Sequence, residues 1–234
     1  MARPQLSRLA LAFAQQTEDL LNRTIASGAV VSATQLGSDV YLVAPGPPLG
    51  EAGIEKLTGL VPASIDRSPA KRTESPIWLK IRYQLTLDDE ATHLTTNSSM
   101  FGWCTHHKSA RCPIRVEYER HKSHKPASHI QVDGESSGWA HGLGRLGRDH
   151  SPLQKLHLPL GGRRFRPSLE DFIEFLIQEQ MVPGKHASWK DGIEEGRQRW
   201  ESMQTRATVR RNPIDAAKQL RQMGYTVKKT TRLR

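Results

Sequence analysis

The chain of 234 residues is long enough to bury a core of its own, as one domain or as one domain with a helical appendage. Its mean hydropathy is −0.58 and only 36% of its residues are hydrophobic. No apolar run approaches the roughly 18 residues of a spanning helix, so we expect no membrane partner. Two cysteines are too few for a disulfide framework and fit a reducing compartment, which predicts a cytoplasmic protein.

The net charge of +10 is concentrated at the C-terminal end of the chain. Residues 197–234 hold eleven Lys or Arg and two Asp or Glu, a net charge of +9, so the other 196 residues carry only +1. This asymmetry indicates a polyanionic partner, either nucleic acid or an acidic protein, or else a solvated helix face that keeps the protein soluble. The candidate nucleic-acid-binding residues are Arg210, Arg211, Lys228, Lys229 and Arg232.

The first element predicted along the chain is an amphipathic helix over residues 5–27. Polar residues at 15, 16 and 18 interrupt the apolar run that a signal peptide would need, and Gly28 ends the helix. A β-hairpin follows, in which two apolar runs flank a turn at residues 37–39. Next come Pro/Ser-rich connectors around a short helix near residues 51–60.

The clearest strand is predicted in "IWLKIRYQLTL", residues 77–87. Its apolar and polar residues alternate, which is typical of a strand with one face on a core and the other in solvent. The inward residues are Leu79, Ile81, Tyr83, Leu85 and Leu87. Residues 92–104, 113–120 and 128–133 are predicted to follow as strands of an antiparallel meander.

Helical patterns return after a Gly/His-rich loop at residues 133–152. A helix is predicted from Leu169 to Gln180 with Ser168 as its N-cap, a second begins after Ser188, and a third covers residues 212–224. In the second helix an apolar stripe at helical spacing is formed by Trp189, Ile193, Trp200, Met203 and Ala207.

These elements predict an α+β fold. We expect a meander of about five to seven strands packed against the first helix and the helix at Leu169–Gln180. Residues 1–182 would form this α+β domain, and residues 183–234 a basic helical C-terminal region.

A zinc site is one interpretation of the stretch around the two cysteines. Cys104, His106, His107 and Cys112 lie within nine residues, and zinc takes tetrahedral Cys and His ligands. Their spacing, C-x-H-H-x4-C, lacks the paired C-x2-C knuckle that positions two thiolates. The alternative is a pair of small buried cysteines on neighbouring strands, with the histidines in a solvated loop. We expect no cofactor and no structural zinc.

Two histidines lie on predicted strands with a polar residue two positions on, and therefore on the same sheet face. These pairs are His93 with Thr95, and His129 with Gln131. Paired H-x-T motifs are a hallmark of two-histidine phosphoesterases, but here the second has Gln and the interval of 36 residues is short. The alternative for His93 is a solvent-facing histidine with no catalytic role.

His129 is the better candidate for general acid or base. It is expected to be an exposed residue of a strand face, with His121 and His124 just upstream as further candidates. Arg115 and Arg82, on the solvated faces of neighbouring strands, would stabilise charge. An imidazole beside a cation is what metal-free RNA cleavage requires.

The parts between residues 77 and 177 are similar to the small prokaryotic toxins of the TumE type. The shared features are the amphipathic strand in "IWLKIRYQLTLDDE", the His-rich "HKSHKPASHIQVDG" and the ending "RRFRPSLEDFIEFLI". The chain is about twice the length of those toxins and has extra helices at both ends. The resemblance implies a toxin-like or mobile-element setting and supplies no substrate.

The leading functional hypothesis is therefore action on RNA, as a toxin-like or mobile-element-associated, metal-independent ribonuclease. The alternative is a non-enzymatic regulatory module that binds nucleic acid or a partner, in which the C-terminal cations would matter and the histidines would not. The expected partners are RNA and an acidic protein such as an antitoxin.

Overall fold

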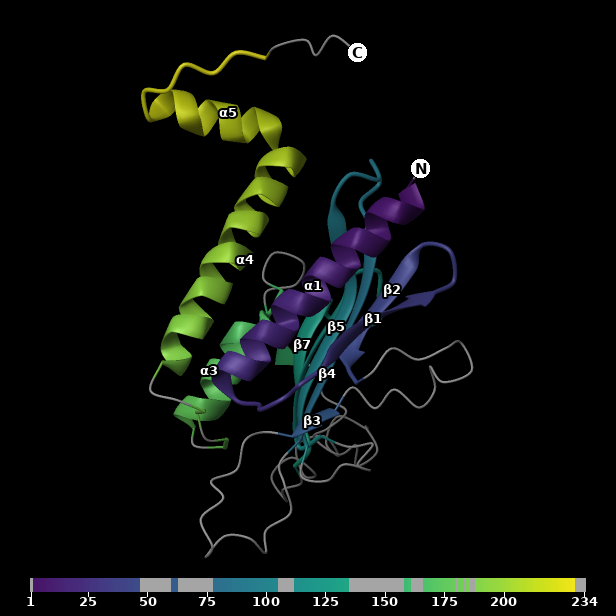
Figure 1. Ribbon diagram of the computed structural model, residues 1–234. Helices are drawn as coiled ribbons and strands as arrows, with labels where there is room; N and C mark the ends of the chain where they lie inside the picture. The colour runs from purple at the N-terminus through teal and green to yellow at the C-terminus, as the bar shows by residue number, and fades with distance from the viewer. Residues whose placement is uncertain are drawn as a thin grey trace, which may run out of the picture.

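The computed structural model describes residues 2–46, 60–62, 78–104, 112–134, 158–160, 166–179, 181–182, 184–185 and 188–229. It has the predicted α+β architecture, with one antiparallel sheet and helices packed on it (Figure 1). The elements are α1 (Ala2–Thr24), β1 (Val31–Leu36), β2 (Val40–Pro45), β3 (Leu60–Pro62), β4 (Trp78–Leu87), β5 (Leu94–Cys104), β6 (Ile114–Glu119), β7 (Ser128–Val132), β8 (Leu158–Pro159), α3 (Leu169–Gln178), α4 (Trp189–Arg211) and α5 (Pro213–Gln222).

The sheet is the predicted meander. Its strand order is β1-β2-β4-β5-β6-β7-β8, every neighbouring pair is antiparallel, and β3 pairs with β4 alongside β2. The β1–β2 hairpin turns at Gly37, whose φ of +70° is a conformation that glycine adopts without strain. The sheet has eight strands, one more than the expected range, because Leu60–Pro62 forms a strand where we had predicted the end of a helix. The rest of that helix lies outside the described residues.

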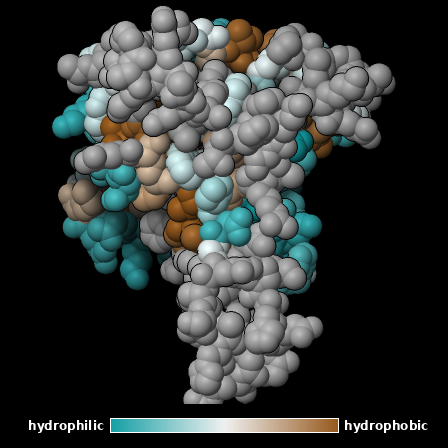
Figure 2. Space-filling view, turned by 90° about the horizontal axis from the view of Figure 1, so that it is seen from below, coloured by the Kyte–Doolittle hydropathy of each residue, from teal (hydrophilic) through white to brown (hydrophobic). Residues whose placement is uncertain are grey.

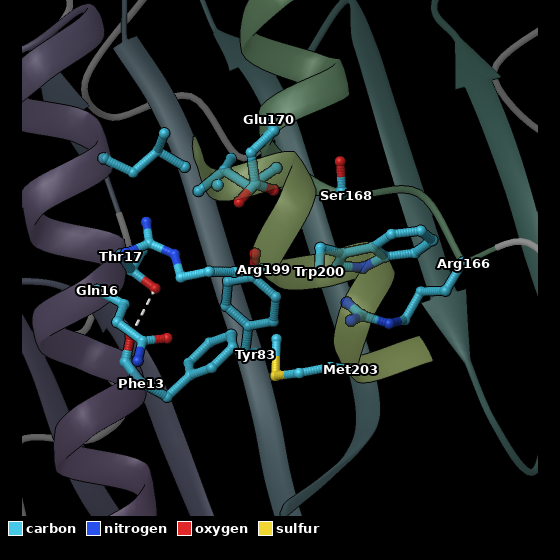
Figure 3. Close-up of a pocket in the computed structure, with 13 residues that line it drawn as sticks. Phe13, Gln16, Thr17, Tyr83, Arg166, Ser168, Glu170, Arg199, Trp200 and Met203 are labelled. Atoms are coloured by element: carbon cyan, nitrogen blue, oxygen red, sulfur yellow. Dashed lines mark hydrogen bonds between the residues drawn. The ribbon is translucent and has the colours of Figure 1, made fainter. Parts of the chain in front are cut away.

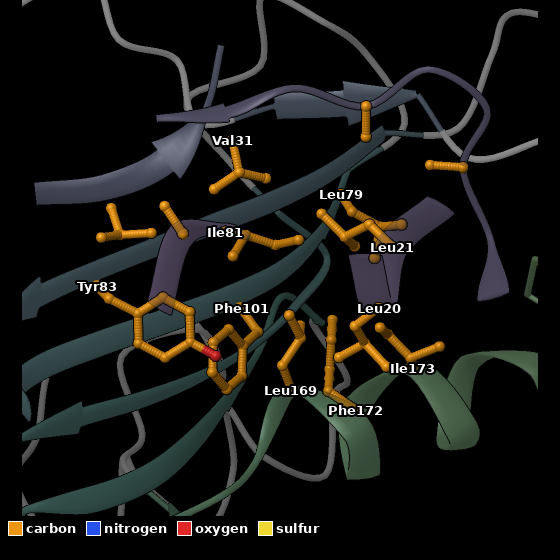
Figure 4. Packing of buried hydrophobic residues seen from close by; sticks show 14 of the residues in the cluster. Leu20, Leu21, Val31, Leu79, Ile81, Tyr83, Phe101, Leu169, Phe172 and Ile173 are labelled. Carbon is orange, nitrogen blue, oxygen red and sulfur yellow. The ribbon is translucent and has the colours of Figure 1, made fainter. Parts of the chain in front are cut away.

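The alternation in β4 separates two faces of the sheet, as predicted. Leu79, Ile81, Tyr83 and Leu85 are buried, whereas the residues between them are partly or fully exposed. Their neighbours across the register, among them Phe101, continue the apolar face onto β5 and β6. Figure 4 shows this face meeting the apolar side chains of α1 and α3, so the core lies between the sheet and its helices.

A capping hydrogen bond fixes the start of α3, and a glycine in α4 lets that helix lie close to α3. Ser168 caps α3, since its side chain accepts a hydrogen bond from the backbone N–H of Asp171. In α4, a Cβ atom at Gly196 would lie 2.6 Å from Oε1 of Glu170, so the absence of a side chain lets α4 approach α3. Ile193 of α4 belongs to the core.

The second half of α4 leaves the body of the protein. Only Gly192, Ile193 and Gly196 of this helix are buried, and α5 has no buried residue. Met203, part of the apolar stripe read from the sequence, is 46% exposed, so that stripe is buried only where α4 crosses the body. In Figure 1 the end of α4 and all of α5 stand away from the sheet.

The other end of the molecule, near β3, is viewed in Figure 2, where hydrophobic residues appear as patches between hydrophilic ones on the described surface. Among the helices that the structure describes, none has the length and apolar character needed to cross a membrane.

Candidate functional site

The face of the sheet opposite the helices carries a cluster of polar residues, as the alternation predicted. The register places Arg82, Met100, Glu117 and His129 in one row across β4 to β7. The next row holds Lys80, Gly102, Arg115 and Gln131. The alternation in the sequence thus predicted which residues share this face of the sheet. Only the structure shows which of them are in contact.

Glu117 is the centre of this polar cluster. Its carboxylate lies 2.9 Å from Nε of Arg115, 3.4 Å from Nζ of Lys125 and 3.2 Å from Nε2 of His129. Burial alone would raise the pKa of Glu117, but the hydrogen bond with His129 and the charges of Arg115 and Lys125 outweigh it and lower the pKa to about 2. Glu117 is thus held as an anion by three neighbours.

His129 is not the exposed residue that we expected. Its side chain is 0% exposed, Nδ1 lies 2.9 Å from the carbonyl oxygen of Pro126, and Nε2 faces Glu117. Both ring nitrogens face acceptor oxygens, an arrangement in which each can donate a proton. The prediction of an accessible histidine on the strand face is therefore wrong. Strand alternation shows which face a residue is on, but it does not show whether that face is open to solvent.

The remaining cations of the cluster, Lys80 and Arg82, have no ion pair with any residue in the described part of the chain. Burial, followed by the charges of Arg82 and Arg115, lowers the pKa of Lys80. Arg115 is itself taken up by Glu117 and donates to Oε1 of Gln131 at 3.0 Å. Of the two arginines expected to stabilise charge, Arg115 lies on the strand next to the buried imidazole, whereas β5 and β6 separate Arg82 from it.

We had predicted that His93 lies on a strand, and this prediction is wrong, because His93 lies in the β4–β5 turn. Its Nδ1 is 3.2 Å from Oδ2 of Asp88 and 2.7 Å from Oγ1 of Thr92. Asp88 also accepts the backbone N–H groups of both residues, and these bonds lower its pKa although burial opposes them. These bonds hold the turn closed.

His121 and His124 lie in the turn between β6 and β7, where both are exposed. This turn is at the same end of the sheet as the β4–β5 turn that holds His93 (Figure 1). The four candidate histidines are thus divided between two exposed turns and one buried strand position.

The two cysteines form a disulfide. Cys104, the last residue of β5, and Cys112, just before β6, are bonded with their Cα atoms 4.5 Å apart, so the expectation of two separate thiols is wrong. A disulfide leaves neither sulfur as a thiolate ligand for zinc. His106 and His107 lie outside the described residues, and within those residues no group of three or more His, Cys, Asp or Glu could hold a metal ion.

Residues 203–229, at the end of α4, in α5 and just after it, are here called the basic arm. They include seven Lys or Arg and one Asp. Arg210, Arg211, Lys228 and Lys229 are all exposed on it. Arg232 lies outside the described residues.

A cavity at the root of the basic arm was not predicted from the sequence. It has a volume of about 50 Å³ and lies where α1, β4, the start of α3 and α4 meet (Figure 3). Polar groups of Tyr83, Arg166, Glu170 and Trp200 line it. Burial raises the pKa values of Tyr83 and Glu170 and lowers that of Arg166. No sequence pattern links these residues, because they come from three separate elements and a connecting segment.

Comparison with known proteins adds no relative, since no family model, no curated protein and no solved structure matches the chain. The similarity to TumE-type toxins stays a prediction from the quoted motifs.

Proposed function

We propose that the protein is a nucleic-acid-binding module that uses its basic arm, with RNA as the expected partner. The observation that supports this most is the contrast between two arginines that form ion pairs where α4 packs on α1 and α3, and the cations of the arm. On the body, Arg23 pairs with Glu195 at 2.7 Å, and Arg197 pairs with Asp171 and Glu174. These two arginines are neutralised within the protein.

The cations of the arm have no such partners. Arg206 donates to the hydroxyl of Ser202, Arg211 to the carbonyl of Ala207, and Arg221 to the carbonyl of Val227. No described carboxylate forms an ion pair with any of the seven, and the arm's one acidic residue, Asp215, is exposed. An unneutralised net charge of +6 on a projecting helical segment is suited to a polyanion.

The arginines of α4 also form a stripe. Arg199, Arg206 and Arg210 are separated by seven and four residues, a spacing that places them on one side of a helix. At 1.5 Å per residue the stripe is about 16 Å long. It begins at the cavity, which Arg199 lines, and continues onto the arm. A single strand can therefore contact several of these cations in sequence.

The test is the salt dependence of RNA binding by the full chain. Fluorescence anisotropy with a labelled single-stranded RNA should give a Kd that weakens with NaCl. The double variant Arg210→Ala/Arg211→Ala should bind more weakly, and the slope of log K against log salt should fall by about 0.7 for each lost phosphate contact. Removing residues 228–234 should act in the same direction.

The matched control is Arg8→Ala, which removes an exposed cation of α1 that is not on the arm. It should leave the slope unchanged. Equal slopes for the arm variant and the parent protein would contradict the proposal and assign the charge to solubility. Parallel titrations with single-stranded and duplex DNA would show whether RNA is preferred.

One observation favours a second candidate, an acidic protein partner such as an antitoxin. The arm exposes large apolar side chains that phosphate contacts do not need, with Ile214 82%, Met223 62% and Tyr225 61% exposed. An amphipathic acidic segment would use both these side chains and the cations. If this candidate is correct, Ile214→Ser/Met223→Ser should abolish partner binding and leave RNA binding intact.

Cleavage of RNA stays a prediction from the sequence. With His129 enclosed, the described histidines that solvent reaches are His93, His121 and His124. Of these, His121 and His124 share a short turn with Lys122, an exposed cation of the kind that metal-free cleavage requires. Lys125, near the end of the same turn, is paired with Glu117 and Glu119.

A further inference from the structure

We propose that the cavity at the root of the basic arm binds the terminal phosphate monoester of a nucleic-acid strand. This inference deepens the proposed function, on which it rests, by assigning the strand end to a defined pocket. Three observations support it, namely the hydrogen-bond donors that surround the cavity, the volume of the cavity and the stripe of arginines on α4 that leads to it.

The cavity is lined by hydrogen-bond donors for which the described residues supply no acceptor. The Arg166 guanidinium has no hydrogen bond or ion pair with any described residue, and the buried indole N–H of Trp200 has no acceptor. The hydroxyl of Tyr83, a residue that is 4% exposed, also forms no hydrogen bond with the described residues. A buried indole N–H without an acceptor is costly. The guanidinium of Arg166 is partly buried, and the nearby Glu170 offsets its charge without forming an ion pair with it.

One multivalent acceptor would satisfy all three donors together. Figure 3 shows Arg166, Trp200 and Tyr83 around the same hollow, contributed by the segment before α3, by α4 and by β4. A phosphate monoester has three terminal oxygens and a charge near −2 at neutral pH, whereas a carboxylate has only two oxygens and one charge. A volume of about 50 Å³ holds a few water-sized groups, which suits a phosphoryl group and excludes a nucleobase.

Two further features suit an anion. The first turn of α3, with Ser168 and Leu169, lines the cavity, and the N-terminal end of a helix favours negative charge. Glu170 is the one acidic group on the wall. Burial raises its pKa although the charge of Arg166 opposes this, and the net direction weakens the repulsion of an anion.

The stripe of arginines explains why the phosphate would belong to a strand. A shallow groove between α1 and α4 adjoins the cavity and shares Gln16, Arg199 and Met203 with it. The groove ends at Arg206, from which the stripe continues to Arg210 on the arm. A strand lying along the arm would therefore reach the cavity with its end.

The experiment compares RNA 12-mers of one sequence that differ only in their ends, with a 5′-phosphate, a 3′-phosphate or hydroxyls at both ends. Binding to the full chain is measured by fluorescence anisotropy. We expect one of the phosphorylated RNAs to bind about tenfold or more tightly than the hydroxyl RNA, the effect of one or more charge-assisted hydrogen bonds.

Two variants test the pocket itself. Trp200→Phe keeps an aromatic ring and removes only the N–H, and Arg166→Met removes the guanidinium at similar length. Each should bring the ratio of the Kd values for hydroxyl and phosphorylated RNA close to 1. Arg8→Met, outside the cavity, should leave the ratio as in the parent, and circular dichroism checks that every variant is folded.

The outcomes separate this inference from the proposed function. RNA binding with no preference for either phosphorylated end would overturn the phosphate pocket and leave the arm proposal intact. Absence of binding to all three RNAs would overturn the arm proposal as well. Inorganic phosphate alone should raise the Tm of the parent and not of Arg166→Met; if it does so while the RNAs show no end preference, the cavity takes the free anion and the strand-end assignment is wrong.

Discussion

Replacing Glu117 with Gln keeps the shape of the side chain and removes the charge at the centre of the polar cluster. The carboxylate has three cationic or hydrogen-bonding neighbours, Arg115, Lys125 and His129, between 2.9 and 3.4 Å away. Its pKa of about 2, compared with an ordinary value of 4.5, corresponds to about 3 kcal/mol of stabilisation at neutral pH. Because 17% of the side chain is exposed, solvent screening reduces this, and we expect the variant to lose about 2 kcal/mol.

The pH dependence follows from the direction of the shift. Since the pKa of Glu117 is lower in the folded chain than in the unfolded one, its stabilisation is fully present above about pH 4.5 and is lost as the pH falls toward 2. Urea unfolding of the parent and of Glu117→Gln, followed by circular dichroism, should show a gap of about 2 kcal/mol at pH 7. The gap should narrow below pH 4.5, because protonated Glu117 resembles glutamine.

The control for this experiment is Glu90→Gln, in the exposed β4–β5 turn. It should change the free energy of unfolding by less than about 0.5 kcal/mol at any pH. A gap for Glu117→Gln that stayed constant from pH 7 to about pH 2.5 would show that Glu117 acts through packing and not through charge. No gap at pH 7 would refute the reasoning outright.

Three other outcomes are expected. His129→Ala should lower the free energy of unfolding by about 2–3 kcal/mol, because the ring is fully buried and bonded at both nitrogens; a loss under about 1 kcal/mol in urea unfolding would mean that the ring is exposed in solution. Elemental analysis of protein purified without chelators should find no zinc. If the protein instead carries about one equivalent of zinc, and removing that zinc lowers the Tm, a metal site at Cys104 and Cys112 would be restored. If the protein cleaves labelled RNA, His121→Ala/His124→Ala should reduce the rate by about 10²–10⁴-fold, and an unchanged rate would remove both histidines from the mechanism.

Local patterns were enough to predict most of the fold. The strict alternation from Leu79 to Leu85 predicted a strand with two unlike faces, and the turn at Gly37 predicted a hairpin, because side-chain direction in a strand has a period of two. Ser168 predicted the start of α3, since a cap hydrogen bond joins residues that are close in sequence. The same alternation placed Arg115 and His129 on one face. The excess of cations after residue 197 is likewise a property of composition.

What the tertiary structure decided depends on segments that are distant in sequence. The burial of His129 and the exposure of Met203 are set by which parts of the chain cover each residue. The cavity is the clearest case, because Tyr83, Arg166 and Trp200 meet only when α4 packs across α1 and α3. Their positions in the sequence follow no common period, since packing between elements joins residues without regard to their separation along the chain.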